Sequence, residues 1–392
     1  VLLMAGANSL GQLIRQAPAL WLAAAVFALA SLAASWNATE FNYAIKRWYA
    51  YGGHAALAAA VAMMIAFLGV RVAQILLCLL CACVVLLLGE LLVIIDNWLM
   101  FSHLAPGRVY TPAYFNHIRN FAHVPTLGLA LGLWLGWSAR SDWARMLGHG
   151  FALLNMIVLV WAAGRVSLAV VPLLVLAYGW LAFDTGRGRK ILLVLCYGLL
   201  AYGLVVGSGN DQMLSNATQR MSEDVSAFDA VVSAPQAETG GNFEKLGSGR
   251  VGLWREALQL SRANWLLGSG GDAFLVAHLD PDVRPNLTAA HPHNWVLRLL
   301  LEYGVVGLGL VLFMLAVLAR RVIQIERFPA RNEAARERAI VYVLALVWLL
   351  YGGVLGTLYY AWPLHVFMIL LGCVLAFTSV GPDSAVKPEA VQ

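Results

Sequence analysis

The chain has 392 residues, of which 61% are hydrophobic and only 12% are charged. This composition is far more apolar than that of a soluble domain, and several runs reach the roughly 20 apolar residues that a helix needs to cross a bilayer. The sequence therefore excludes a soluble globular protein and predicts an all-α polytopic integral membrane protein. The net charge is +5, and its placement along the chain is more informative than its size.

Hydrophobic runs along the chain predict about ten membrane-spanning helices. They cover about residues 17–35, 53–70, 72–95, 121–137, 147–163, 166–183, 191–207, 293–318, 339–358 and 364–380. A break between Glu90 and Leu104 would raise the number toward twelve. The predicted regions are N-terminal transmembrane helices at 1–207, a large helical polar loop at 208–292, C-terminal transmembrane helices at 293–380 and a polar tail at 381–392.

Basic residues predict which ends of the helices face the cytoplasm, because cytoplasmic loops carry an excess of Lys and Arg. The connections that concentrate these residues hold Arg140 and Arg145, then Arg187, Arg189 and Lys190, and then the six arginines of segment 320–338. We therefore predict that these connections and both termini are cytoplasmic, and that the 208–292 loop faces outward. The loop 36–52, which holds Lys46 and Arg47, departs from the rule.

The five cysteines all lie inside apolar runs. Three of them are close in sequence, but no His or further Cys accompanies them in a polar setting, as a metal site requires. We interpret all five as small buried hydrophobic residues: Cys78, Cys81, Cys83, Cys196 and Cys373. The sequence predicts no metal site and no cofactor, and we expect membrane lipids but no nucleic acid among its partners.

The segment His291–Gly307, HPHNWVLRLLLEYGVVG, stands where the polar loop ends and an apolar run begins. Pro292 suits the first turn of a helix, so we expect His293 and Asn294 in that turn at the membrane boundary. The positive end of the helix dipole disfavours a protonated imidazole and keeps His293 available as a base near neutral pH. An ordinary polar helix cap is the alternative interpretation.

The same predicted helix carries charged residues into the membrane. Arg298 and Glu302 are four residues apart, so they are expected to pair on one face that points toward the interior of the bundle. Gly304 and Gly307 form a strip of small residues that permits close approach of another helix.

A predicted amphipathic helix lies in the second half of the polar loop. The apolar residues that recur there at helical spacing, and that would lie along the membrane surface, are Val251, Trp254, Leu258 and Trp265. Ser248 is expected to cap this helix, and Arg250 in its first turn makes a good anion site together with the backbone N–H groups. A solvated basic face is the plainer alternative. The glycine-rich residues 268–271 lack the Lys-Ser/Thr of a nucleotide-binding loop and are interpreted as the turn that ends the helix.

Arg165 stands alone between two strongly apolar runs. An arginine at such a place either extends to lipid headgroups or serves a buried anion. Its predicted outward position is level with His293 and Arg250. We therefore expect two arginines and a histidine to meet at one membrane face, where a lipid-linked phosphate or diphosphate would use them.

Three motifs in this order resemble the O-antigen ligase family, within the superfamily that includes O-antigen polymerases and O-linked oligosaccharyltransferases. The ligase pattern is His followed by Asn, Ser or Gln, then nine residues of any type, then Gly-x-x-Gly. This chain matches the pattern with HN at 293–294 and GVVG at 304–307. Two hydroxyl residues often follow in the family, whereas this chain has LG at 308–309. SGR at 248–250 and GRVSLAVV at 164–171 also resemble the superfamily, although Ser is usual where this chain has Gly164.

The resemblance implies an inverting, metal-independent glycosyltransferase with a GT-C-like fold in the inner membrane of a Gram-negative bacterium. Such an enzyme moves O-antigen glycan from undecaprenyl diphosphate to lipid A–core oligosaccharide at the periplasmic face, in lipopolysaccharide biosynthesis. It implies that His293 is the general base and that Arg165 and Arg250 hold the diphosphate in place of a metal ion. The remaining candidates are Arg119 and Arg255 for the diphosphate, and Asn294 and Glu302 for orienting the site.

Alternative functions differ in the acceptor or in the kind of activity. An O-antigen polymerase would join one glycan to another, and an oligosaccharyltransferase would modify Ser or Thr of a protein; the His-Asn spacing favours the ligase over both. A transporter of lipid-linked glycans would need polar residues deep in several spans, where the sequence has few. A structural membrane scaffold would leave the grouping of basic residues and His293 without a purpose.

Overall fold

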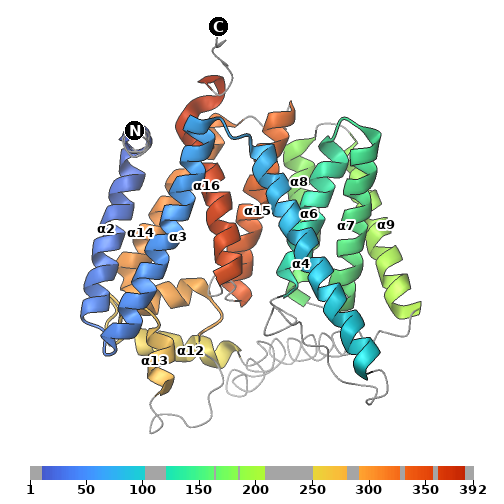
Figure 1. The fold of residues 1–392 in the computed structure, drawn as a ribbon. Coiled ribbons are helices and arrows are strands. Elements are labelled where there is room, and N and C mark those ends of the chain that lie inside the picture. Colours follow the sequence, from blue (N-terminus) through green and yellow to red (C-terminus); the bar gives the residue numbers. More distant parts are fainter. Residues whose placement is uncertain are drawn as a thin grey trace, which may run out of the picture. The chain divides into compact units, whose positions relative to one another are not determined.

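The computed structural model describes residues 11–101, 121–162, 165–183, 186–207, 250–279, 291–326, 332–355 and 361–384. In these ranges every regular element is an α-helix (Figure 1). The predicted all-α class is therefore confirmed. Helices are the expected solution for these apolar runs, because in lipid every backbone N–H and C=O group has to be paired within its own segment.

Each predicted span overlaps a helix. These helices are α2 (Pro18–Trp36), α3 (Phe41–Leu68), α4 (Val72–Phe101), α6 (His123–Ser138), α7 (Asp142–Ala162), α8 (Arg165–Ala182), α9 (Arg187–Gly207), α14 (Trp295–Ile325), α15 (Glu333–Leu355) and α16 (Ala361–Ser384). The described part of the polar loop adds α12 (Arg250–Ser261) and α13 (Ala273–Leu279).

The chain is an integral membrane protein. Within the described ranges, six helices are long and apolar enough to cross a bilayer, namely α2, α3, α4, α7, α9 and α14. Shorter apolar stretches lie in α8 at Ala169–Ala182 and in α16 at Trp362–Thr378. The total of ten to twelve spans and the predicted orientation remain predictions.

The predicted loop at 36–52 is wrong in most of its length, because α3 already begins at Phe41. Arg47 belongs to this helix and pairs with Asp272, at 2.7 Å between Nη2 and Oδ1. Because Asp272 neutralises the charge of Arg47 inside the fold, Arg47 does not have to lie in a solvent-exposed loop. This pairing accounts for Arg47, but not for the exposed Lys46, in the departure of this segment from the expected charge distribution.

The chain forms two compact units, each discontinuous in sequence. The first contains residues 1–70, 223–327 and 348–392, and the second contains residues 71–222 and 328–347. The regions predicted from the sequence were consecutive, with boundaries at 207, 292 and 380. They describe which parts of the chain lie in the membrane, and they remain a prediction.

In the first unit, α3 packs against α16, and α2 packs against both α14 and α3. The contact between α3 and α16 is close because small residues face each other. A Cβ added to Gly372 of α16 would lie 2.7 Å from the Cβ of Val61, and the neighbouring Ala58 and Ala62 of α3 are buried. Small residues are the usual means by which two membrane helices approach closely.

In the second unit, α6 and α7 form the tightest helix pair. Glycines at every fourth position of α6, Gly128, Gly132 and Gly136, lie against α7. A Cβ added to Gly132 would lie 2.8 Å from the backbone nitrogen of Ala152. This spacing is the small-residue pattern of closely packed membrane helices, and it leaves α6 almost entirely buried.

Candidate functional site

The functional candidate His293 lies in a tight turn just before α14, and its predicted position inside the first helical turn is wrong. The helix begins at Trp295, with Asn294 as its N-cap. The side-chain oxygen of Asn294 accepts hydrogen bonds from the backbone N–H groups of Val296 and Leu297, at 2.9 and 3.2 Å. Because Asn294 satisfies the end of the helix, His293 is left outside it, half-buried and with a φ of +54°.

Helix α14 is broken at Gly304, where φ is 64° and ψ is −170°. This backbone conformation is essentially restricted to glycine. A Cβ at Gly304 would also collide with the backbone of Leu266. The expected role of Gly304 in helix approach is therefore corrected: it admits a non-helical segment, and not another helix, against α14.

The segment 265–270 pairs with the broken turn of α14. The backbone N–H groups of Ser269 and Gly270 donate to the carbonyls of Leu301 and Glu302, both at 2.9 Å. In the other direction, the N–H of Val305 donates to the carbonyl of Trp265 at 2.9 Å. Backbone groups that the break releases are thus satisfied by the glycine-rich turn, and this pairing gives the glycines of residues 268–271 a structural role.

A network of two arginines and two carboxylates fixes this turn to α14. Arg298 Nε donates to Glu302 Oε1 at 2.7 Å, which confirms the predicted pair. Arg298 Nη2 also lies 3.4 Å from Asp272 Oδ1, and Arg47 donates to both oxygens of Asp272 at 2.7 to 3.0 Å. The backbone N–H of Asp272 donates to Glu302 Oε1 at 3.0 Å, so the carboxylate of Glu302 joins the helix and the turn directly.

Tyr51 closes the network on the α3 side. Its hydroxyl donates to Glu302 Oε2 at 3.4 Å, and the guanidinium carbon of Arg298 lies 5.7 Å from the centre of its ring. Arg298 and Glu302 are buried, at 7% and 1% exposure. The positive charges of Arg47 and Arg298 are therefore matched by the negative charges of Asp272 and Glu302. We interpret this network as a structural clamp, because its charges are already paired with one another and not available to an anionic substrate.

His291 is the buried partner of His293. The backbone N–H of His293 donates to His291 Nδ1 at 3.2 Å, and the ring centres lie 4.1 Å apart. Burial lowers the pKa of His291 to about 3, and the charges of His293, Arg298 and Arg47 act in the same direction. The lowered pKa agrees with the hydrogen bond, because Nδ1 has to be unprotonated in order to accept it.

We expect His291 to make the fold sensitive to acid. The unfolded chain takes up a proton on this side chain below its usual pKa of 6.5, whereas the folded protein does so only near pH 3. Proton uptake therefore favours unfolding, and stability should fall as the pH drops from 6.5 toward 3. His291→Asn places a non-titrating acceptor near the position of Nδ1, and its unfolding midpoint should depend less on pH than that of the wild type. Equal pH dependence in the two proteins would show that His291 does not contribute.

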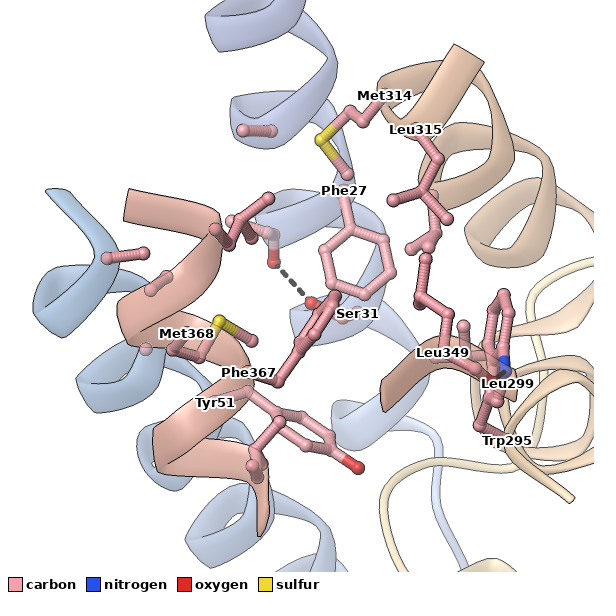
Figure 2. A pocket seen from close by; sticks show the side chains of 18 of the residues that line it. Phe27, Ser31, Tyr51, Trp295, Leu299, Met314, Leu315, Leu349, Phe367 and Met368 are labelled. Carbon is pink, nitrogen blue, oxygen red and sulfur yellow. Dashed lines mark hydrogen bonds between the residues drawn. The ribbon is translucent and has the colours of Figure 1, made fainter. Parts of the chain in front are cut away.

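An apolar cavity of 360 Å³ lies beside this turn. Its walls come from α2, α3, α14, α16 and Leu349, all in the first unit. It extends along α14 from Trp295 to Met314 and Leu315, with Phe27, Tyr51 and Phe367 around it (Figure 2). The polar side chains near its Trp295 end are those of His291, Asn294, Arg298 and Tyr51. Such a long apolar space with one polar end suits a hydrocarbon chain attached to a polar group.

The predicted amphipathic helix is shorter than expected and packs on a different face. α12 ends at Ser261, so Trp265 lies beyond it in the segment that pairs with α14. Leu253, Ala257 and Leu260 face Phe274 and Leu301, because these residues follow one another at helical spacing on the inner side. Exposed apolar residues remain at the surface of this region: Leu258, Trp265, Leu266 and Leu267.

The predicted diphosphate-binding arginines occupy different parts of the chain. Arg165 begins α8 in the second unit and Arg250 begins α12 in the first; neither side chain is among those described. Arg255 is exposed on α12, and Arg119 lies outside the described residues. The meeting of Arg165, Arg250 and His293 at one site therefore remains a prediction.

A protein-family model described as O-antigen ligase matches residues 149–313. No curated protein matches the chain significantly. The matched range includes α8, α12 and the turn before α14, and with them Arg165, Arg250, Asp272 and His293; Arg47 and Arg119 lie outside it. Over residues 149–313 the chain is therefore similar to the O-antigen ligase family.

Proposed function

We propose that this protein transfers O-antigen glycan from undecaprenyl diphosphate to lipid A–core oligosaccharide at the periplasmic face of the inner membrane. The observation that carries the proposal is the position of His293. It is held at a positive φ between His291 and Asn294, two residues that line the apolar cavity. A side chain at this place can act on the polar part of a lipid whose hydrocarbon chain enters the cavity.

In the proposed reaction, His293 accepts the proton of an acceptor hydroxyl of the lipid A–core. The hydroxyl oxygen attacks the anomeric carbon of the glycan from the side opposite the diphosphate. The bond between that carbon and the phosphate oxygen breaks, which inverts the anomeric configuration. Undecaprenyl diphosphate leaves with the bonding electrons.

The leaving diphosphate needs fixed positive charge. Arg165 and Arg250 hold it in this proposal, with Arg255 and Arg119 as further contributors, and guanidinium groups suit the task because they bind phosphate oxygens in pairs. Arg298 is not assigned to the diphosphate, since Glu302 and Asp272 already neutralise it. Asn294 and Glu302 orient the site by capping and clamping α14.

The test is transfer by the purified protein in liposomes that contain a labelled undecaprenyl-diphosphate glycan. Lipid A–core, a Ser-rich peptide and a second lipid-linked glycan are supplied in separate reactions, each with a chelator. We expect label on lipid A–core alone, and an undiminished rate with the chelator. Label on the peptide would identify an oligosaccharyltransferase, label on the second glycan a polymerase, and movement of the lipid across the bilayer without transfer a transporter.

A further inference from the structure

Three aromatic rings of the second unit contact one another near the C-terminal ends of α6 and α8. Trp137 and Tyr178 are stacked, with ring centres 5.6 Å apart and planes at 14°. Phe183 meets both of them edge to face, at 5.6 and 5.8 Å. Tyr178 and Phe183 are buried, so the three rings form a closely packed aromatic cluster.

Two cationic side chains share this cluster. Lys190 Nζ lies 4.2 Å from the centre of the Phe183 ring and 5.5 Å from that of Trp137. The guanidinium carbon of Arg336 lies 5.1 Å from the centre of the same Phe183 ring. Both contacts are favourable cation–π interactions. However, they bring two like charges within electrostatic range of each other.

Two carboxylates of α15, Glu333 and Glu337, lie near these two charges. Glu333 pairs with Arg140 at 2.8 Å, whereas Glu337 lies within electrostatic range of Tyr178 in the cluster. Within the described residues, neither Lys190 nor Arg336 forms an ion pair with Glu333 or Glu337. Two adjacent cations in this state favour an anion as their partner.

Hydrogen-bond donors at the cluster also lack acceptors. The indole Nε1 of Trp137 and the Nε of Arg336 are buried and make no hydrogen bond in the described part of the protein. The hydroxyls of Tyr178 and Ser138 are also buried, and they lie close enough to interact with each other. Apart from this contact, neither hydroxyl has a hydrogen-bond partner among the described residues. Buried donors are normally paired, and a group with several acceptor oxygens would pair them.

The position of the cluster indicates where that anion comes from. α9 is apolar enough to cross a bilayer and begins at Arg187, so Lys190 lies at the interfacial end of a membrane span. Phosphate groups of lipids occupy this depth, and Trp, Tyr and basic residues concentrate there. We propose that Trp137, Tyr178, Lys190 and Arg336 form a binding site for the phosphate group of an anionic membrane lipid. In the predicted orientation this is the cytoplasmic leaflet, and the site is separate from the proposed glycan transfer.

The test is lipid binding to the full-length protein in a neutral detergent, measured by native mass spectrometry. Phosphatidylglycerol and a polyprenyl phosphate are titrated separately, because both carry the phosphate chemistry. Lys190→Gln and Arg336→Gln are each expected to weaken binding of the true ligand by roughly five- to tenfold. Trp137→Phe keeps a ring for Lys190 but removes the indole N–H, and is expected to weaken binding by about threefold.

Arg189→Gln is the matched control, since it removes the same charge from the exposed residue next to Lys190. It should change binding less than twofold, and the melting temperatures of all variants should show that they are folded. Selective loss of phosphatidylglycerol binding identifies a phospholipid as the ligand, and selective loss of polyprenyl phosphate identifies a prenyl lipid. Unchanged binding of both lipids in the cluster variants, or an equal loss in Arg189→Gln, would overturn the proposal.

Discussion

Replacing His293 with Asn or Ala is expected to lower the rate of glycan transfer by about 10² to 10⁴, the usual contribution of a positioned general base. Donor binding should persist, because the proposed contacts to the diphosphate come from arginines. The rate is measured by transfer of labelled glycan to lipid A–core in liposomes. Affinity is measured by binding of the labelled donor to each purified variant.

The two substitutions separate chemistry from backbone strain. His293 has a φ of +54°, a conformation that Asn and His adopt far more readily than Ala. His293→Asn therefore removes the base while keeping a residue that tolerates the turn, whereas His293→Ala adds strain. Both should lose transfer to a similar degree, and only His293→Ala should also melt at a lower temperature. Normal transfer by His293→Asn would exclude His293 as the base.

The helices were predictable because each depends on a local property of the sequence. A long apolar run becomes a helix in lipid regardless of what it packs against, and the Arg298–Glu302 pair follows from helical spacing alone. The start of α14 was misplaced by two residues, because both Pro292 and Asn294 signal a helix start. The structure shows that the Asn294 side chain is the cap.

The clamp around Asp272 was not predictable in the same way. Arg47 and Asp272 are separated by 225 residues, and no local pattern joins them. The one available signal was that Arg47 departs from the expected distribution of basic residues, which indicates a charge with a partner inside the fold. Gly304 was likewise interpreted as a packing glycine, since a sequence does not reveal whether a small side chain or a positive φ is required.

Replacing Asp272 with Asn is expected to lower the free energy of unfolding by about 3 kcal/mol, because it leaves Arg47 and Arg298 without their shared carboxylate. The value is at the lower end for a buried ion pair, since the Arg47 side chain keeps 21% of its exposure. Asp272 has a φ of +60°, which Asn also tolerates, so the substitution changes the charge and not the backbone preference. The measurement is thermal unfolding in detergent, where we expect the midpoint to fall by roughly 10 °C.

Glu333→Gln provides the matched control, because it breaks the ion pair with Arg140, whose side chains are 89% and 45% exposed. An exposed pair of this kind contributes at most about 1 kcal/mol. Combining Asp272→Asn with Arg47→Gln removes one charge of each sign and leaves Arg298 paired with Glu302. The loss of unfolding free energy in the double variant should therefore be smaller than the sum of the losses in the two single variants. If Asp272→Asn costs no more than Glu333→Gln, solvent screens the network, and the backbone pairing at Gly304 alone must hold the turn against α14.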